Sequence, residues 1–125
     1  KGHSRSSGGA VNLYACQANF ARVVFEENKS THTSGMSRLG GAIYAIYSAI
    51  DIDNCTFESN EASTSGGAIY ANQTEVFIDN VTTFVDNSAS SSGGAIYILQ
   101  DNLEIQGGSF TTNTVLTSSG SGGAI

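Results

Sequence analysis

The segment GGAIYANQTEVFIDNVTTFVDNSASSSGGAI, residues 66–96, decides the fold of this chain, because it contains one complete repeat and the start of the next. It opens with Gly66-Gly67-Ala68, closes with Phe84-Val85-Asp86-Asn87 and returns to Gly93-Gly94-Ala95. The other copies of the two motifs are Gly8-Gly9-Ala10, Gly40-Gly41-Ala42 and Gly122-Gly123-Ala124, and Phe25 to Asn28, Phe57 to Asn60 and Phe110 to Asn113. Such strict alternation is typical of a solenoid rather than of a globular enzyme.

The two parts of each repeat differ in their tolerance of length change. From the first Gly to the Phe the distance is 17 residues in three repeats and 18 in the third, whereas the stretch from the Asn to the next Gly-Gly varies widely. Its long versions are Lys29 to Leu39 and Thr114 to Ser121. Variation in length at one point of a stacked unit indicates a surface loop.

Apolar residues alternate with polar or aromatic ones after each Gly-Gly-Ala motif, which predicts a strand with one face in the core. A second alternating stretch follows, and the Phe of Phe-x-x-Asn is expected to end a third short strand and to point inward. Three strands per repeat, each pairing with its counterpart one repeat away, predict an all-β, right-handed parallel β-helix of about four coils. Asn28, Asn60, Asn87 and Asn113 are then expected to form an asparagine ladder beside a ladder of phenylalanines.

Composition excludes several classes of protein. The 125 residues fit one domain, carry a formal net charge of −6 and contain no apolar run long enough to cross a bilayer. Five basic residues scattered among eleven acidic ones leave no nucleic-acid-binding pattern.

Neither end has the sequence of a solenoid cap. We therefore expect residues 1–125 to be a single internal segment of a longer β-helix, with coils starting near residues 8, 40, 66, 93 and 122.

The pair of motifs resembles the repeat of the chlamydial polymorphic membrane proteins, whose signatures are Gly-Gly-Ala followed by Ile, Leu or Val, and Phe-x-x-Asn. The resemblance covers the chain from Gly8 to Ile125. It implies a β-helical passenger of a surface-exposed autotransporter adhesin that attaches to host cells. Related repeats occur in surface proteins of other bacteria and of microbial eukaryotes, so the resemblance does not identify a receptor.

Outward positions on successive coils provide two candidate surfaces. Tyr44, Tyr70 and Tyr97 are expected to stack as a stripe that either contacts a partner or simply stabilises neighbouring coils. Asp53 and Asp79 are expected about one strand spacing apart, where repulsion raises one pKa or recruits a cation. A calcium site requires six to eight oxygen ligands. The predicted role of the two carboxylates is therefore a solvated acidic face, with no bound metal.

Catalytic chemistry has little support in the sequence. His3 and His32 have no Cys or Glu at metal-ligand spacing, the serines form no Gly-x-Ser-x-Gly motif, and the glycine pairs lack the Lys of a phosphate-binding loop. We therefore expect no catalytic residue, no cofactor and no enzyme activity. Cys16 and Cys55 occur at different points of their coils, and we expect no disulfide between them.

Four Asn-x-Ser/Thr sequons begin at Asn28, Asn54, Asn72 and Asn80. We expect Asn28 to be buried and unmodified, and we regard Asn54, Asn80 and Asn72 as candidate glycosylation sites. Asn54 and Asn80 are predicted to share one outward corner of successive coils.

The leading functional hypothesis is adhesion of a cell-surface or extracellular protein, at the outer membrane in a bacterium, to a surface protein or glycan. A structural shaft of an extracellular filament, formed by self-association, is the alternative. An enzyme acting on polysaccharide is a remote third, because the fold also supports such enzymes. We expect no nucleic-acid partner and no membrane insertion by this segment.

Overall fold

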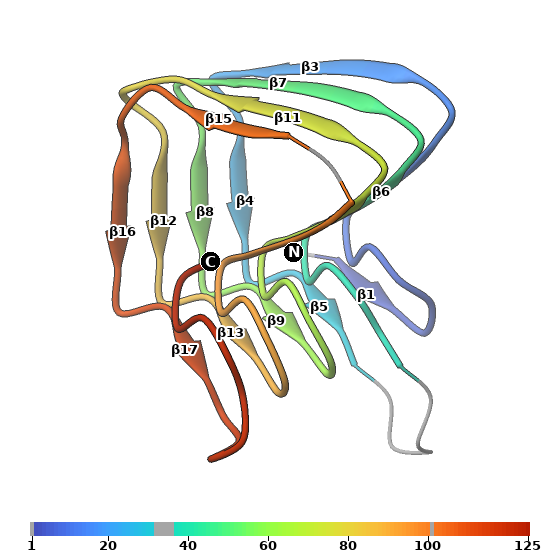
Figure 1. Cartoon of the computed structure of the whole chain (residues 1–125), viewed down its shortest axis with the longest axis vertical. Coiled ribbons are helices and arrows are strands. Elements are labelled where there is room, and N and C mark those ends of the chain that lie inside the picture. Colours follow the sequence, from blue (N-terminus) through green and yellow to red (C-terminus); the bar gives the residue numbers. More distant parts are fainter. Residues whose placement is uncertain (1, 32–36, 101) are drawn as a thin grey trace.

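The computed structural model describes residues 2–31, 37–100 and 102–125. The secondary-structure elements in this part of the chain are all β-strands. Each strand pairs in parallel with the equivalent strand one coil away (Figure 1). The chain therefore winds as a parallel β-helix of about four coils, which confirms the predicted fold class. Three sheets form the sides of a roughly triangular coil, and a fourth projects from one corner.

Sheet 1 follows the Gly-Gly-Ala motifs. Its strands are β2 (Val11–Tyr14), β6 (Ile43–Ile46), β10 (Ile69–Asn72) and β14 (Ile96–Leu99). In β6 the side chains of Ile43 and Ala45 are fully buried, while Tyr44 between them points to the other face. The period-two alternation read from the sequence is thus the alternation of the strand, and the register aligns Tyr44, Tyr70 and Tyr97.

Sheets 2 and 3 complete the triangular coil. Sheet 2 contains β3 (Gln17–Ala21), β7 (Ala49–Asp53), β11 (Glu75–Ile78) and β15 (Leu103–Ile105). Sheet 3 contains β4 (Val24–Glu26), β8 (Thr56–Glu58), β12 (Thr83–Val85) and β16 (Ser109–Thr111). The motif phenylalanine is the middle residue of each sheet 3 strand. The sequence had suggested that this phenylalanine ends the strand. That prediction is wrong, because the residue after it still pairs with the neighbouring coil.

Sheet 4 is an element that the sequence did not predict, since three strands per repeat were expected. It consists of β1 (His3–Ser4), β5 (Lys29–Ser30), β9 (Glu61–Ala62), β13 (Ser88–Ala89) and β17 (Thr114–Val115). Each of these two-residue strands follows directly after a Phe-x-x-Asn motif or, for β1, its positional equivalent. Each starts the segment that leaves the triangular coil and returns to the next Gly-Gly; we call this segment the arm of its coil.

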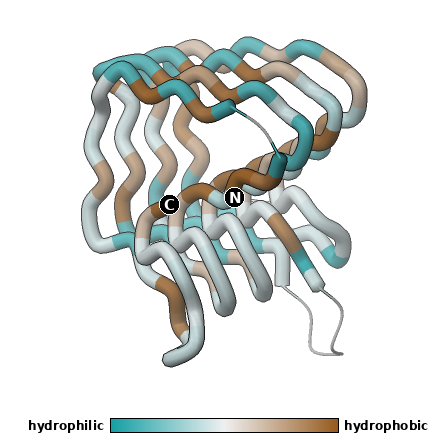
Figure 2. The backbone as a smooth tube through the Cα atoms, in the orientation of Figure 1, coloured by the Kyte–Doolittle hydropathy of each residue, from teal (hydrophilic) through white to brown (hydrophobic). Residues whose placement is uncertain are grey.

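Phenylalanine and isoleucine columns fill the core. Phe57 stacks at 4.7 Å between the rings of Phe25 and Phe84, and Phe84 stacks at 4.7 Å on Phe110. Phe57 and Phe84 are fully buried, and burying such a side chain stabilises the fold by about 1.5–3 kcal/mol. Figure 2 shows hydrophobic stretches along the triangular coil and mostly pale, less hydrophobic loops in the arms. The arms therefore lie outside the apolar core.

Left-handed backbone conformations form the corners of the coil. In the second coil Tyr47, Asn54 and Ser59 have φ angles of 52°, 49° and 55°, and Gly66 at the start of the next coil has a φ of 68°. Each non-glycine residue in this region costs about 1 kcal/mol. Pairing with the coils on either side offsets that cost, so the corners depend on stacking and not on local sequence preference alone.

Candidate functional site

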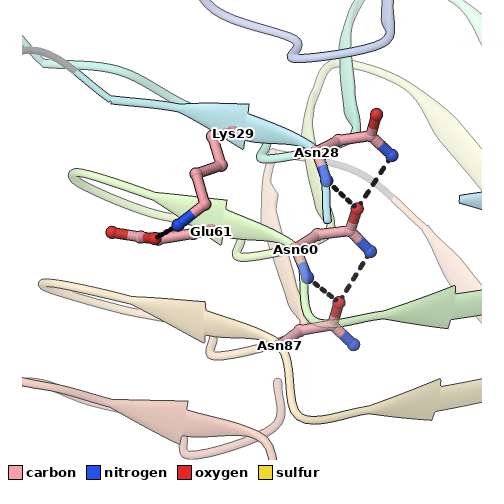
Figure 3. Close-up of polar contacts among 5 residues, drawn as sticks. All are labelled: Asn28, Lys29, Asn60, Glu61 and Asn87. Carbon is pink, nitrogen blue, oxygen red and sulfur yellow. Dashed lines mark hydrogen bonds and ion pairs between the residues drawn. The ribbon is translucent and has the colours of Figure 1, made fainter. Parts of the chain in front are cut away.

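The asparagines of the Phe-x-x-Asn motifs stack as one hydrogen-bonded column, and Figure 3 shows its first three members, Asn28, Asn60 and Asn87. The backbone nitrogen and Nδ2 of Asn60 both donate to Oδ1 of Asn87, at 3.0 and 2.8 Å. The same Nδ2 also donates to the carbonyl oxygen of Phe25 at 2.9 Å. Asn60 and Asn87 are completely buried. The predicted stacking of asparagine side chains is confirmed, and the amides of Asn60 and Asn87 bond to the coils on both sides.

Each Gly-Gly-Ala motif has three distinct structural requirements. The first glycine has a left-handed φ, for example 64° at Gly40, which suits a residue without Cβ. A Cβ on the second glycine, Gly67, would collide with the carbonyl oxygen of Gly94 and lie 2.7 Å from the backbone nitrogen of Ser88. The alanine is fully buried in the central coils. The motif is thus fixed by backbone packing.

The two motifs meet at the base of each arm. Ser88, which approaches the second glycine Gly67, is the residue directly after Asn87. The chain leaves the coil there and returns at a second paired column, in which Leu39, Ser65, Ser92 and Ser121 form parallel bridges. The arm base is therefore closed by the asparagine column and the second glycines.

Arms differ in length while their bases keep one register. Lys29 pairs with Glu61 and Ser88 with Thr114 at the start of the arms, and the bridges restore the register at their ends. The arms of the second and third coils have five residues each, whereas those of the first and fourth coils are longer. Residues 32–36 of the predicted long loop Lys29 to Leu39 lie outside the described residues. The other long loop, Thr114 to Ser121, includes β17 and exposed residues 116–119.

An ion pair joins the first two arms. Nζ of Lys29 lies 2.6 Å from Oε2 of Glu61 across adjacent coils (Figure 3). Both side chains are more than a third exposed. Exposed pairs of this kind contribute less than about 1 kcal/mol, so this pair adds little to the stability of the base.

The tyrosine stripe is a tight stack of rings. Centroids lie 5.5 Å apart for Tyr44 and Tyr70 and 5.4 Å apart for Tyr70 and Tyr97, with the rings nearly parallel. Tyr70 is only 8% exposed. Burial, followed by its two tyrosine neighbours, raises the pKa of its hydroxyl above the usual value. Because the ring faces cover one another, the stripe offers a partner mainly ring edges, and its role in contact stays a prediction.

Hydroxyl side chains close two other corners, and sequence reasoning did not single them out. Oγ1 of Thr74 accepts a hydrogen bond from the backbone nitrogen of Ser48 at 3.2 Å, and Oγ1 of Thr82 accepts one from that of Cys55 at 3.1 Å. Both threonines are fully buried. The sequence feature that could have identified these two residues is the sequon, since Thr74 and Thr82 are the threonines of Asn72-Gln73-Thr74 and Asn80-Val81-Thr82.

The sequon asparagines differ in exposure. Asn28 is 3% exposed and lies in the asparagine column, where it was expected. Asn54 and Asn80 are exposed in the corner between sheets 2 and 3, whereas Asn72, at the end of β10, is half-buried. The candidate glycosylation of Asn54, Asn80 and Asn72 stays a prediction.

Asp53 and Asp79 form the expected carboxyl pair. A hydrogen bond with Asp79, then desolvation, raises the pKa of Asp53 above its usual value. The pKa of Asp79 is lowered, chiefly by its hydrogen bond from the Thr82 hydroxyl, whose oxygen lies 2.6 Å from Oδ1. Among the described residues no group of three or more His, Cys, Asp or Glu side chains gathers to bind a metal. His3 is exposed, and His32 lies outside the described residues.

The outer face of sheet 2 carries a shallow hollow of about 420 Å³, bordered by Gln17, Ala49, Asp51, Glu75, Phe77 and Glu104. Its three carboxylates make this face acidic. Acidic side chains bordering an open hollow are equally typical of a solvated surface, so the carboxylates by themselves assign no ligand to it.

Both cysteines are free thiols. Cys55 belongs to the core and is 1% exposed, and burial raises the pKa of its thiol. Cys16 is exposed at the corner that follows sheet 1.

In the part of the chain that the structure describes, no helix is long and apolar enough to cross a membrane.

Comparison with known proteins identifies the family of this chain. No curated protein and no solved structure matches the chain significantly. The family model described as the Chlamydia polymorphic membrane protein (Chlamydia_PMP) repeat matches residues 22–46, 54–72 and 76–99, more than half of the chain. Its matches include the Phe-x-x-Asn and Gly-Gly-Ala motifs that form the arm bases, and the chain therefore belongs to the Chlamydia polymorphic membrane protein repeat family.

Proposed function

We propose that this β-helix is an adhesive segment, which binds a protein or glycan on another surface through its arms and outer strand faces. Membership of the polymorphic membrane protein repeat family makes the chain a repeat segment of a surface protein. The proposal adds non-catalytic attachment to a partner, at the cell surface or outside the cell. It includes the autotransporter-passenger arrangement that the family resemblance implies.

The observation that carries this proposal is the closed base of the arms. Leu39, Ser65, Ser92 and Ser121 stay in register although the arms between these bridges and the asparagine column differ in length. A rigid scaffold with loops of variable length and sequence is the common arrangement for binding surfaces. The buried Phe and Asn columns are enclosed by neighbouring coils, so they support binding only by positioning the arms.

The test exchanges arms without disturbing their bases. Lys29 to Leu39 is replaced by the sequence of Glu61 to Ser65, and Thr114 to Ser121 by that of Ser88 to Ser92. Binding of labelled protein to cultured epithelial cells and to immobilised glycans is then measured over a concentration series. We expect saturable binding by the native chain and its loss in the exchanged variant, with an unchanged melting temperature.

A matched control exchanges the two five-residue arms, Glu61 to Ser65 and Ser88 to Ser92, with each other. This swap keeps every arm at its native length and should leave binding intact. Full binding after both long arms are shortened would remove the arms from the proposal. Absence of saturable binding by the native chain to every cell type and glycan would reject adhesion by this segment.

A second candidate is a structural shaft whose coils associate side by side. The feature that favours it is the absence of charged residues from the four strands of sheet 1.

A further inference from the structure

We propose that the outer face of sheet 2 is a docking site for an arginine side chain of a basic protein segment. The site is centred on Phe77, which borders the hollow of about 420 Å³ on this face. Sheet 2 lies on the opposite side of the triangular coil from the arms (Figure 1). The inference therefore does not depend on attachment through the arms.

Phe77 is an aromatic ring that the packing of the core does not explain. It is the one phenylalanine of the six in the chain that does not belong to the core cluster. In β11 it points outward with Glu75, while Val76 and Ile78 are buried. Its ring stacks on no other aromatic ring in the part of the chain that the structure describes. The partly exposed ring is therefore available to a ligand.

Carboxylates surround this ring. The register places Phe77 directly between Asp51 of β7 and Glu104 of β15, each one strand spacing, or about 5 Å, away. Glu75 lies two residues earlier on the same strand and points to the same face. These three acidic residues are exposed, and within the described ranges none of them has a cationic partner. The hollow thus combines an aromatic surface with uncompensated negative charge.

The same excess of negative charge extends along sheet 2. Its four strands contain no Lys, Arg or His. At one end of the face Asp53 and Asp79 share a hydrogen bond, which raises the pKa of Asp53, and Arg22 only partly offsets this effect. Like charges on neighbouring strands destabilise a sheet. A bound cation would relieve that repulsion, so the face is complementary to a basic partner.

Arginine is the basic side chain that matches both parts of the site. Its guanidinium group is planar, stacks on the face of an aromatic ring and donates hydrogen bonds to carboxylates at its edges. Placed over Phe77, it would have the carboxylates of Asp51 and Glu104 on its two flanks. A lysine ammonium would be attracted by the same charges but has no plane to stack on the ring.

Other occupants match this face less well. A metal ion needs oxygen ligands within about 2.6 Å, whereas Asp51 and Glu104 are separated by the ring and lie about 10 Å apart. A second copy of this chain has the same formal net charge of −6 and is repelled. A neutral sugar can stack on the ring but leaves the carboxylates uncompensated.

The test titrates the purified, isotope-labelled chain with an amidated heptapeptide of alternating glycine and arginine, followed through the backbone amide signals by NMR. The same peptide with citrulline in place of arginine is the matched ligand control, because citrulline has nearly the same shape without the charge. We expect saturable shifts centred on Asp51, Phe77 and Glu104 with the arginine peptide, and none with the citrulline peptide. Sodium chloride should weaken the binding, since salt screens attraction between exposed charges.

Two variants test the ring and the carboxylates separately. Phe77→Leu removes the ring but keeps an apolar side chain and the net charge, and it should weaken binding by about fivefold. Glu104→Gln removes one flanking charge and should weaken binding by about as much. Glu58→Gln makes the same charge change at an exposed position of sheet 3 and should bind within about twofold of the native chain.

The amide spectrum of each variant reports its fold, and Glu104→Gln decides the result if Phe77→Leu changes it. The variant with shortened arms should bind the arginine peptide as the native chain does. Loss of cell attachment by that variant would therefore leave this inference unaffected.

Four results would overturn the proposal. The first is the absence of saturable shifts at Phe77 with the arginine peptide, or equal binding of the citrulline peptide. The second is unchanged binding by a folded Phe77→Leu variant, which would reduce the site to an acidic patch. The third is equal weakening by Glu58→Gln and Glu104→Gln, which would make the effect one of net charge. The fourth is a shift at Phe77 with a neutral oligosaccharide of glucose that is stronger than with the arginine peptide and independent of salt.

Discussion

Asn60 bonds to Asn87 twice, through its backbone nitrogen and its side-chain nitrogen, and both bonds end on the same oxygen, Oδ1 of Asn87. The second proton of the Asn60 amide goes in the opposite direction, to the carbonyl of Phe25. The fully buried Asn60 side chain thus satisfies two backbone groups of the first coil, the nitrogen of Asn28 and the carbonyl of Phe25, and also bonds to the Asn87 side chain of the third coil. Leucine, although similar in size, can make none of the side-chain bonds and keeps only the one from its backbone nitrogen.

Asn60→Leu should lower the free energy of unfolding by on the order of 3 kcal/mol, because it leaves several buried polar groups without partners. The groups affected are the two donors of Asn28 and the carbonyl of Phe25. Urea unfolding followed by circular dichroism measures the change. Asn19→Leu, on the exposed outer face of sheet 2, is the control and should change stability by less than about 0.5 kcal/mol. Equal effects at the two positions would contradict a structural role for the column.

Gly67→Ala tests the close approach at the arm base. The added methyl would collide with the carbonyl of Gly94, a backbone group that has no rotamer by which to move away. We expect a loss of at least about 3 kcal/mol or failure to fold. Gly123→Ala is the same substitution at the equivalent position, but its nearest atom is 3.6 Å away, an ordinary contact. Thermal melts of the two variants should therefore differ, and similar melts would show that close approach does not explain the motif.

Much of the fold was predictable because each coil repeats the same pattern of buried and exposed residues and the same two motifs. The alternation of Ile43, Tyr44 and Ala45 placed the core face of sheet 1 correctly, since the period of a strand is two whatever its neighbours are. The spacing of the motifs aligned Asn28, Asn60, Asn87 and Asn113 in one column. Because the motifs repeat, the sequence indicates which residues of successive coils lie beside one another. The pattern of a single strand does not contain that information.

Sheet 4 could not be predicted in the same way. Its strands are two residues long and include Lys29, Ser30, Glu61 and Ala62, which have little preference for extended structure. They form because the asparagine column and the second glycines place the arm bases one strand spacing apart. Tyr70 illustrates a related limit: its outward position was predicted, but its burial depends on the rings of Tyr44 and Tyr97 on either side.

Asp53→Asn should stabilise the protein at neutral pH, and the advantage should shrink as the pH is lowered. The pKa of Asp53 is raised in the folded state, so the native fold loses stability relative to the unfolded chain as pH rises through this value. Asparagine removes that loss. Below the usual carboxyl pKa of 3.8, Asp53 is protonated in both states, and the variant and native proteins should melt alike.

The control for this pH dependence is Asp51→Asn, which makes the same change in net charge on the same strand, β7. Melting temperatures of the three proteins between about pH 3 and pH 7 measure the effect, since this interval includes carboxyl titration. Asp79 titrates in the opposite sense, because its lowered pKa gives stability that is lost only in stronger acid. A gain for Asp53→Asn no larger than that for Asp51→Asn would show that the carboxyl pair has no specific influence.

Thr82→Val tests whether the sequon at Asn80 exists because its threonine closes a corner of the coil or because its asparagine carries a glycan. The valine keeps the shape of the side chain but cannot accept the hydrogen bond from the backbone nitrogen of Cys55 or donate to Asp79. Since Thr82 is fully buried, we expect a loss of about 1–3 kcal/mol in protein made in a bacterium without N-glycosylation. Thr83→Val, at the next residue and on the partly exposed outer face of sheet 3, should cost less than about 0.5 kcal/mol. A clear difference in unglycosylated protein would mean that this threonine is required to close the corner, so that the Asn-x-Thr pattern by itself gives no reason to expect a glycan at Asn80. Equal and small losses would leave the sequon without a structural explanation, and glycan mapping at Asn80 would then become the informative measurement.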